Sequence, residues 1–401
     1  MEKISDKYTI ISDNDHRCFL FDYFNCRDIG YQFLDISVDG TELIDVIHHR
    51  RETGKVVLLI VTPATVLRLI REKSKWNDFA KQVQQGKIKL VMATGRPTVN
   101  DQAETSMILT KWLCIKDSTH GLPDKYFKDG RWPNASELSI MEGLPMDVLC
   151  ETGTQGEYMN KSFPNWNFVG LSQIFLLFNE WNALSLFSNP KKDKTFFTFI
   201  NQKMTWSGHR NYLSEKIDQA PYRNDAMVTI GRLGDHNKRT GKYQDLNGQF
   251  GKFWLDHYPN KAFLPNPEAY DRTYFELVCE SLGFHPTDDS FYITEKTFKP
   301  VMMEHPFLML SARHHLRNMR QIGFKTFDGL IDESYDGLEN IKDRIEAIHH
   351  QLMKLDMKKS RELYQESRQI CRHNRDHLLD LQGRCKFDLW KNLHNYFQSI
   401  N

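Results

Sequence analysis

Two dense apolar runs in the first quarter of the chain restrict the fold more than any other feature. They are "KVVLLIV" (55–61) and "IKLVMATG" (88–95), and each ends at a turn residue. Continuous runs of this kind are typical of parallel strands that are buried on both faces. The segment between them has apolar residues at helical spacing, at Val66, Leu69, Ile70, Trp76, Phe79 and Val83. Together with a strand at 7–12, this β-α-β pattern predicts an α/β domain over residues 1–180.

A second alternation of strands and helices begins near residue 190. Strands are expected at 194–201, 226–231, 273–281 and 306–311, with helices starting near 209, 294 and 314. The polar, glycine-rich stretch 231–252 is expected to be a long loop. This pattern predicts a second α/β domain over 190–355 and a helical tail over 356–401 that packs back on the first domain. The expected fold class is therefore α/β, with two doubly wound domains that face each other across a cleft.

Composition excludes several classes of protein. The formal net charge is +1, so no strong overall field attracts nucleic acid or a membrane surface. The seven cysteines are scattered without a C-x-x-C pair, which argues against a disulfide framework and against a zinc ribbon. The polar start, "MEKISDKYTIISDNDH", is unlike a signal peptide, and no run of about 18 apolar residues is present. These features predict a cytoplasmic protein without a membrane span.

Polar residues that could bind a ligand follow several of the expected strands in the second half. Ligands of doubly wound sheets bind at the carboxyl ends of the strands, and exposed amides at a helix N-terminus favour anions. The candidates are His209 and Arg210 at one helix start, Glu280 at a strand end, and Thr294, Glu295, Lys296 and Lys299 at another helix start.

These residue types fit a nucleoside diphosphate. Arg210 and Lys296 are expected at the phosphates, Lys299 is an additional candidate phosphate contact, and Thr294 is expected to cap its helix. Glu295 would repel a phosphate but can accept from both hydroxyls of a ribose. The alternative from spacing alone is that these charged residues are exposed surface groups without a ligand.

Three blocks in this half resemble a known family. They are "FINQKMTWSGHRNYLSEKI" (199–217), "FELVCES" (275–281) and "FYITEKTFKP" (291–300) followed by "PFLML" and "LRNMRQIGFKTFDGLIDESYD". In that order they resemble bacterial and viral glycosyltransferases related to the α-1,3-fucosyltransferases. The resemblance covers about 195–355 and is weak before 190.

The resemblance implies a GT-B-like fold and an inverting transfer that needs no metal and no cofactor. The co-substrate would be a nucleotide sugar, UDP- or GDP-linked. It also assigns donor binding to Arg210, Tyr292, Glu295 and Lys296. The leaving diphosphate would then be stabilised by positive side chains and a helix end.

Inversion needs a base that removes the proton of the acceptor hydroxyl, and the first half should supply it. Asp13, Asp15 and His16 are the first choice, because their loop follows the expected central strand. Asp101, Glu104, Glu151 and Glu157 remain alternatives. Asp13 and Asp15 also form a D-x-D pattern, which metal-dependent transferases use, but three residues are a weak signal.

Three hypotheses about function remain open, two of which differ in the acceptor. A saccharide is the family default. A hydroxymethylated base in duplex DNA is the second, and it needs a basic track such as "HHRRETGK" (48–55) and "RLIREKSK" (68–75). The third is a non-catalytic nucleotide-binding protein of GT-B shape.

Residues 340–401 carry 12 Lys/Arg against 8 Asp/Glu, an excess that fits either a solvated face or a polyanion contact. "HNRDH" (373–377) is interpreted as a helix face and not as a zinc site.

Overall fold

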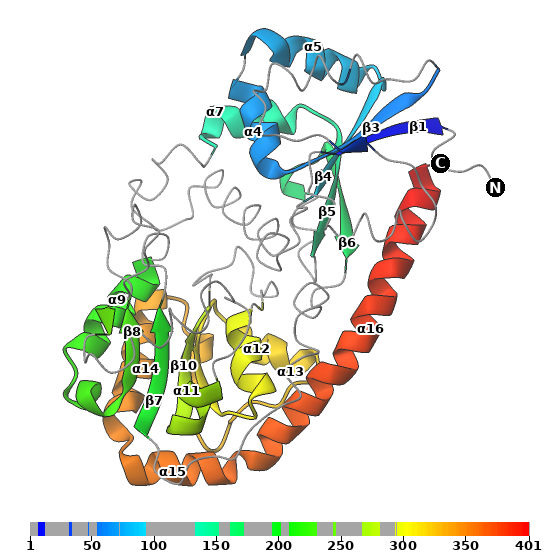
Figure 1. The fold of residues 1–401 in the computed structure, drawn as a ribbon. Helices are drawn as coiled ribbons and strands as arrows, with labels where there is room; N and C mark the ends of the chain where they lie inside the picture. The colour runs from blue at the N-terminus through cyan, green and yellow to red at the C-terminus, as the bar shows by residue number, and fades with distance from the viewer. Residues whose placement is uncertain are drawn as a thin grey trace. The chain divides into compact units, whose positions relative to one another are not determined.

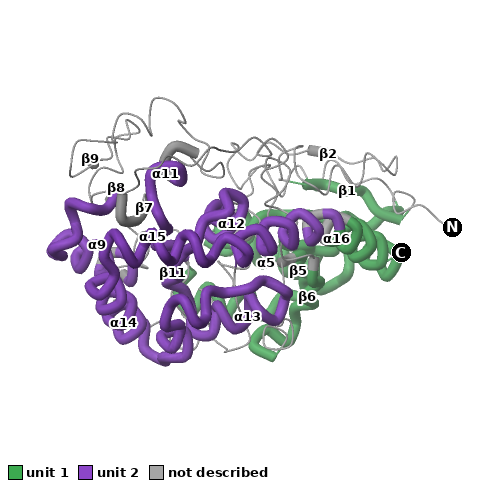
Figure 2. Tube along the Cα trace, turned by 90° about the horizontal axis from the view of Figure 1, so that it is seen from below, with its two compact units in different colours: residues 1–176, 384–401 green, residues 177–383 purple. Residues whose placement is uncertain are grey.

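A computed structural model describes thirteen stretches of the chain: 7–12, 32–33, 47, 54–71, 73–93, 133–151, 161–171, 195–201, 208–230, 244–245, 267–280, 293 and 295–400. The chain divides into two compact units (Figure 2). Unit 1 comprises 1–176 and 384–401, and unit 2 comprises 177–383. Unit 2 thus extends to Gly383, beyond the expected boundary at 355.

Unit 1 is built on a six-stranded parallel sheet in the order β2-β1-β3-β4-β5-β6 (Figure 1). The strands are β1 (Tyr8–Ser12), β2 (Gln32–Phe33), β3 (Val56–Val61), β4 (Ile88–Ala93), β5 (Met146–Glu151) and β6 (Trp166–Leu171). β1, β3 and β4 fall where the apolar runs predict them. β5 and β6 were not predicted.

The helices of unit 1 bury the apolar stripes that the spacing predicts. They are α4 (Pro63–Arg71), α5 (Lys73–Gln84) and α7 (Ala135–Glu142). Val66, Leu69, Ile70, Phe79 and Val83 pack in one core with alternate residues of β3 and β4. Burial of apolar side chains of this size stabilises the fold by about 1.5–3 kcal/mol each.

The last turns of α16 (Arg368–Ile400) belong to unit 1. The Tyr396 hydroxyl donates to Asp147 Oδ2 in β5 at 2.6 Å. Lys89 Nζ lies 2.7 Å from the same oxygen, and the Asn167 amide donates to Oδ1 at 3.0 Å. The buried carboxylate is therefore fully engaged, and it holds the helix end on the sheet.

Unit 2 contains a five-stranded sheet in the order β11-β10-β7-β8-β9. β7 (Thr195–Asn201), β8 (Met227–Ile230), β10 (Thr273–Cys279) and β11 (Phe307–Leu310) are parallel, and β9 (Gln244–Asp245) is antiparallel to β8. The four parallel strands match the expected positions. β9 lies within the stretch expected to be a loop.

Unit 2 contains the helices α9 (Gly208–Asp218), η4 (Pro221–Asp225), α11 (Pro267–Arg272), α12 (Glu295–Met302), α13 (His315–Gln321), η6 (Ser334–Gly337), α14 (Ile341–Lys354) and α15 (Met357–Glu366). The helices expected near 209, 294 and 314 correspond to α9, α12 and α13, whereas η4, α11 and η6 were not predicted. The first half of α16 completes the unit. The helical character predicted from 338 onward is thus confirmed. No helix in the described part of the chain is long and apolar enough to cross a bilayer.

Candidate functional site

The candidate site is the carboxyl end of β10. This strand lies between β11 and β7 and is parallel to both, so the three strands end at the same edge of the sheet. All seven residues of β10 are buried. Glu280 follows directly and is 0% exposed. Because ligands of parallel sheets bind at this edge, the side chains around Cys279 and Glu280 decide what the site can do.

The first turn of α9 holds the end of β10 through its backbone carbonyls. His209 Nε2 lies 3.1 Å from the carbonyl oxygen of Glu280. Arg210 donates from Nε to the same oxygen at 3.2 Å and from Nη2 to the Cys279 carbonyl at 3.0 Å. Both side chains are buried. The two predicted donor-binding residues therefore have a structural task at this edge, which is to satisfy the last carbonyls of the strand.

The first turn of α12 reaches the same residue from the other helix. The Thr297 hydroxyl donates to Glu280 Oε1. Thr297 is fully buried, and Lys296 beside it is half-buried. The carboxylate of Glu280 thus engages α12, while its carbonyl engages α9. Glu280 was predicted to bind the donor, yet its contacts make it the residue that joins the two helix starts.

The charges of the two helices act on the same strand end. Burial raises the pKa of the Cys279 thiol to about 11, and the positive charges of Arg210 and Lys296 oppose that shift. Arg210 and Lys296 therefore both act on the end of β10. With the positive end of the α12 dipole, they create a positive field where the strand ends.

Lys299 lies one turn further along α12 and is half-buried. Its positive charge acts on Glu276, a buried carboxyl in β10 that also accepts from the Tyr270 hydroxyl at 2.8 Å. Burial raises the pKa of Glu276 to about 7, while Tyr270 and Lys299 oppose the rise and the Glu280 charge adds to it. Two carboxyls therefore lie four residues apart, Glu276 in β10 and Glu280 directly after it, and the neighbouring helix α12 carries two lysines.

His315, at the start of α13, is a further polar residue of this region that the sequence analysis assigned no role. It is fully buried, and its Nδ1 lies 2.9 Å from the Ser311 hydroxyl. Burial lowers the pKa of His315, while the carboxylates of Glu280 and Asp336 oppose the shift. No motif marks His315, Thr297 or Glu276, because their relation to the site depends on strand and helix packing.

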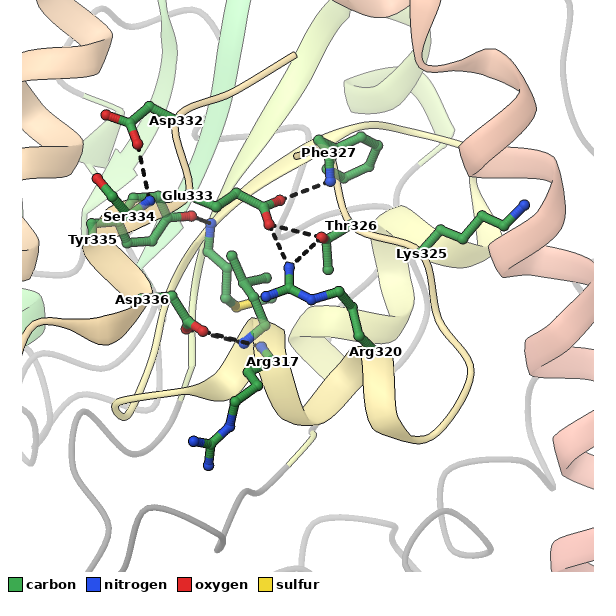
Figure 3. Close-up of polar contacts among 12 residues, drawn as sticks. Arg317, Arg320, Lys325, Thr326, Phe327, Asp332, Glu333, Ser334, Tyr335 and Asp336 are labelled. Carbon is green, nitrogen blue, oxygen red and sulfur yellow. Dashed lines mark hydrogen bonds and ion pairs between the residues drawn. The ribbon is translucent and has the colours of Figure 1, made fainter. Parts of the chain in front are cut away.

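The acidic residues of the segment that follows α13 bind backbone and side-chain groups of the protein itself (Figure 3). The Asp336 carboxylate accepts from the backbone N–H groups of Leu316 and Arg317, at 3.0 and 3.1 Å, and so caps α13 from a distant part of the chain. Glu333 accepts from the Phe327 N–H and from the Thr326 hydroxyl, both at 2.7 Å. The acidic residues of "IDESYD" thus fix the loop and the start of α13.

The histidines of "HNRDH" also bind backbone. His373 Nε2 lies 3.1 Å from the Gly323 carbonyl, and His377 Nε2 lies 2.7 Å from the Ile322 carbonyl. Their rings stack with centroids 5.9 Å apart. Within the described ranges, no group of three or more His, Cys, Asp or Glu side chains is placed to hold a metal ion.

Several predicted residues lie outside the described ones. These are Tyr292 and Thr294 at the donor site, and Asp13, Asp15, His16, Asp101, Glu104 and Glu157 among the candidate bases. Glu295 is the first residue of α12, and Glu151 is the last residue of β5, at the carboxyl edge of its sheet. The choice of catalytic base therefore stays a prediction.

Comparison with known proteins adds no constraint to this geometry. No family model matches the chain, and no curated protein matches it.

Proposed function

We propose that the chain is an inverting, metal-independent glycosyltransferase that moves a sugar from a nucleotide sugar to an acceptor hydroxyl. Unit 2 would bind the nucleotide, and unit 1 would supply the acceptor site and the base. Two α/β units with parallel sheets are consistent with the two-domain GT-B architecture that the sequence resemblance implies. A saccharide is the proposed acceptor.

One observation carries the proposal. Arg210 in α9 donates to the carbonyls of Cys279 and Glu280, and α12, which carries Lys296 in its first turn, is bonded to Glu280 through Thr297, so both helix starts bring positive charge to the carboxyl end of the same buried parallel strand. Sugar transfer leaves negative charge on a nucleoside diphosphate, and fixed positive groups at that position stabilise the charge as it develops. A metal ion is not needed for this task if the protein supplies the charge itself.

The contacts of Arg210 and Lys296 indicate different roles in donor binding. Arg210 already donates to two backbone carbonyls, so its substitution will disturb the end of β10 as well as any ligand. Lys296 is half-buried at the first turn of α12, beside the helix amides. We therefore assign direct diphosphate contact to Lys296 and the start of α12, support to Arg210, and ribose recognition to Glu295.

Glu280 becomes a positioning residue in this scheme. Its carboxylate accepts from Thr297 in α12, and its carbonyl accepts from Arg210 in α9. It therefore fixes the distance between the two helix starts that carry the positive charges. This assignment replaces direct donor contact, because a side chain that is 0% exposed does not present its carboxylate to a ligand.

The test is turnover with a panel of UDP- and GDP-sugars, followed as nucleoside diphosphate release with and without saccharide acceptors. Lys296→Met should lower kcat/KM by about 10- to 100-fold, because one charge-assisted contact contributes about 1.5–3 kcal/mol. Lys342→Met, which removes an exposed lysine of α14, is the matched control and should leave turnover unchanged. Absence of turnover with every donor, or equal activity of Lys296→Met and wild type, would refute the proposal.

The structure gives less support to DNA as the acceptor. In the second of the two basic stretches, Arg71 pairs with Glu137 at 2.8 Å, which neutralises part of its charge. Arg68 is exposed on the same helix. Residues 48–53 of the first stretch lie outside the described ones. A gel shift with duplex DNA remains the experiment that would favour this alternative, through a steep loss of affinity with salt.

A further inference from the structure

A second concentration of positive charge lies on the first half of α16, within unit 2. Arg375 Nη1 is 2.6 Å from Oε1 of Glu304, and Arg368 Nη2 is 3.1 Å from Oε2. Arg372 Nε lies 3.8 Å from the same Oε2. Three guanidinium groups therefore face one carboxylate, which leaves this cluster with a net charge of about +2.

Glu304 has a backbone conformation that glutamate rarely adopts, so backbone propensity does not explain a carboxylate at this position. Glu304 has a φ of 48°, in the left-handed region that favours glycine. Its N–H donates to the Val301 carbonyl at 3.1 Å, and the His305 N–H donates to the Pro300 carbonyl at 2.8 Å. These two bonds form the helix-ending motif whose left-handed position is usually glycine.

The helix dipole is also unfavourable at this position. Glu304 follows the C-terminal end of α12, which is the negative end of the helix dipole. The arginines of α16 are thus the local feature that stabilises a carboxylate there. Their combined charge exceeds what one carboxylate can balance.

Two of the three guanidinium groups, those of Arg368 and Arg375, are held in place beside the carboxylate. Arg368 lies over the Tyr364 ring, 5.4 Å from its centroid, and also donates to the Glu304 carbonyl at 3.3 Å. Arg375 Nε is buried and has no hydrogen-bond partner among the described residues. Arg372 is 66% exposed and makes only the long contact to Glu304. The open side of the cluster is therefore at Arg372, whose guanidinium is exposed, while the Arg375 Nε is buried.

This cluster is separate from the candidate donor site. Glu304 lies just before β11, at the amino ends of the parallel strands, because β11 begins at Phe307 opposite Glu276. The donor site lies at the carboxyl end of β10. The two positive regions are thus at opposite edges of the same sheet, and the second does not depend on the proposed function.

We propose that Arg368, Arg372 and Arg375 form a binding site for a single phosphate dianion, either inorganic phosphate or a small phosphate monoester. Guanidinium groups bind phosphate oxygens through paired N–H donors. A charge of about −2 balances the excess that remains after Glu304 is counted. The three groups converge on one carboxylate and do not follow a line, so the proposal is a site for one phosphate and not a track along a polyanion.

Isothermal titration calorimetry with inorganic phosphate and with phenyl phosphate tests the proposal. The full chain is used at pH 8 and at constant ionic strength set with NaCl. All titrations are made in the Lys296→Met variant as well as in wild type, so that binding at the donor site is recognised. Binding at the arginine site should persist in Lys296→Met, which makes this test independent of the transferase assignment.

Arg372→Ala is the decisive variant, because this exposed side chain can be removed without leaving a buried group unpaired. We expect phosphate affinity to fall at least tenfold. Glu304→Gln should bind phosphate at least threefold more tightly, since it removes the competing carboxylate. Lys358→Ala removes an 85% exposed lysine of α15 and should bind as wild type does.

Equal phosphate affinity of Arg372→Ala and wild type would overturn the proposal, as would the absence of any effect of phosphate beyond that of NaCl. Binding of Glu304→Gln no tighter than that of wild type would refute the charge argument. A single-stranded oligonucleotide is the last probe. If it binds through Arg372 while inorganic phosphate and phenyl phosphate do not, the surface recognises nucleic acid and the single-phosphate site is wrong.

Discussion

The buried carboxyl of Glu276 should make the stability of unit 2 depend on pH. Burial raises its pKa from 4.5 to about 7, against the opposing effects of the Tyr270 hydrogen bond and the Lys299 charge. Between pH 4.5 and pH 7, the Glu276 carboxyl is therefore protonated in the folded state and ionised in the unfolded chain. The stabilising contribution is complete below the unfolded pKa of 4.5 and is lost as pH rises through 7.

The size of the effect follows from the shift. A difference of one unit corresponds to about 1.4 kcal/mol, so the free energy of unfolding should lose about 3 kcal/mol across this range. Glu276→Gln keeps an oxygen that can accept from Tyr270 and removes the ionisation. The variant should match wild type near pH 4.5 and should be more stable than wild type by about 3 kcal/mol at pH 8.

Urea unfolding of wild type and Glu276→Gln at half-unit steps from pH 4.5 to 8 measures the difference. Titrating groups distant from Glu276 are common to both proteins and cancel in the subtraction. A difference that stays constant across the pH range would show that Glu276 is ionised in the folded protein and would refute the reasoning.

Four further substitutions test the packing within the two units, each by urea unfolding. A Cβ at Gly323 would lie 2.5 Å from a histidine ring of α16, and φ is +99° there, so Gly323→Ala should lower the free energy of unfolding by more than about 2 kcal/mol. Gly329→Ala shares the positive φ but has open space, so it should cost only about 1 kcal/mol; equal losses would contradict the clash. Tyr396→Phe removes the 2.6 Å hydrogen bond to buried Asp147 and should cost about 1–3 kcal/mol, and no loss would show that the bond is not needed. Asp336→Ala removes the cap of α13 and should cost about 1–2 kcal/mol; a stability equal to wild type would exclude this capping role.

The sequence predicted the elements whose apolar pattern is strong. The runs at 55–61 and 88–95 and the four parallel strands of unit 2 are present, because continuous β-branched and apolar residues have few alternatives to a buried strand. β5 was missed, since Asp147 interrupts its apolar pattern. That carboxylate is buried through partners as distant as Tyr396, which no local pattern reveals.

The helix α7 was also not predicted, although a local sequence signal marks its start. The Asn134 side chain accepts from the Glu137 N–H, and the Glu137 carboxylate accepts from the Asn134 N–H. This reciprocal pair is an N-terminal signature that "NASE" contains, so the sequence carried the signal. The helix could have been predicted.

At the candidate site, too, the sequence predicted part of the arrangement and tertiary packing decides the rest. Residue type and position relative to strand ends identified Arg210, Lys296 and Glu280 as neighbours. Their separate tasks depend on hydrogen bonds between α9, β10 and α12, which only the packed structure supplies. Thr297 and Glu276 were missed for the same reason, because burial of a polar side chain is decided by its tertiary partners.

The central claim is that a nucleoside diphosphate binds at the end of β10, against the start of α12. Amide hydrogen exchange in the presence of millimolar UDP or GDP tests this claim most directly. We predict slower exchange at 295–299 and at 208–212 with at least one nucleotide, and loss of that protection in Lys296→Met. Unchanged exchange in both segments with both nucleotides, or protection confined to other parts of the chain, would contradict the account.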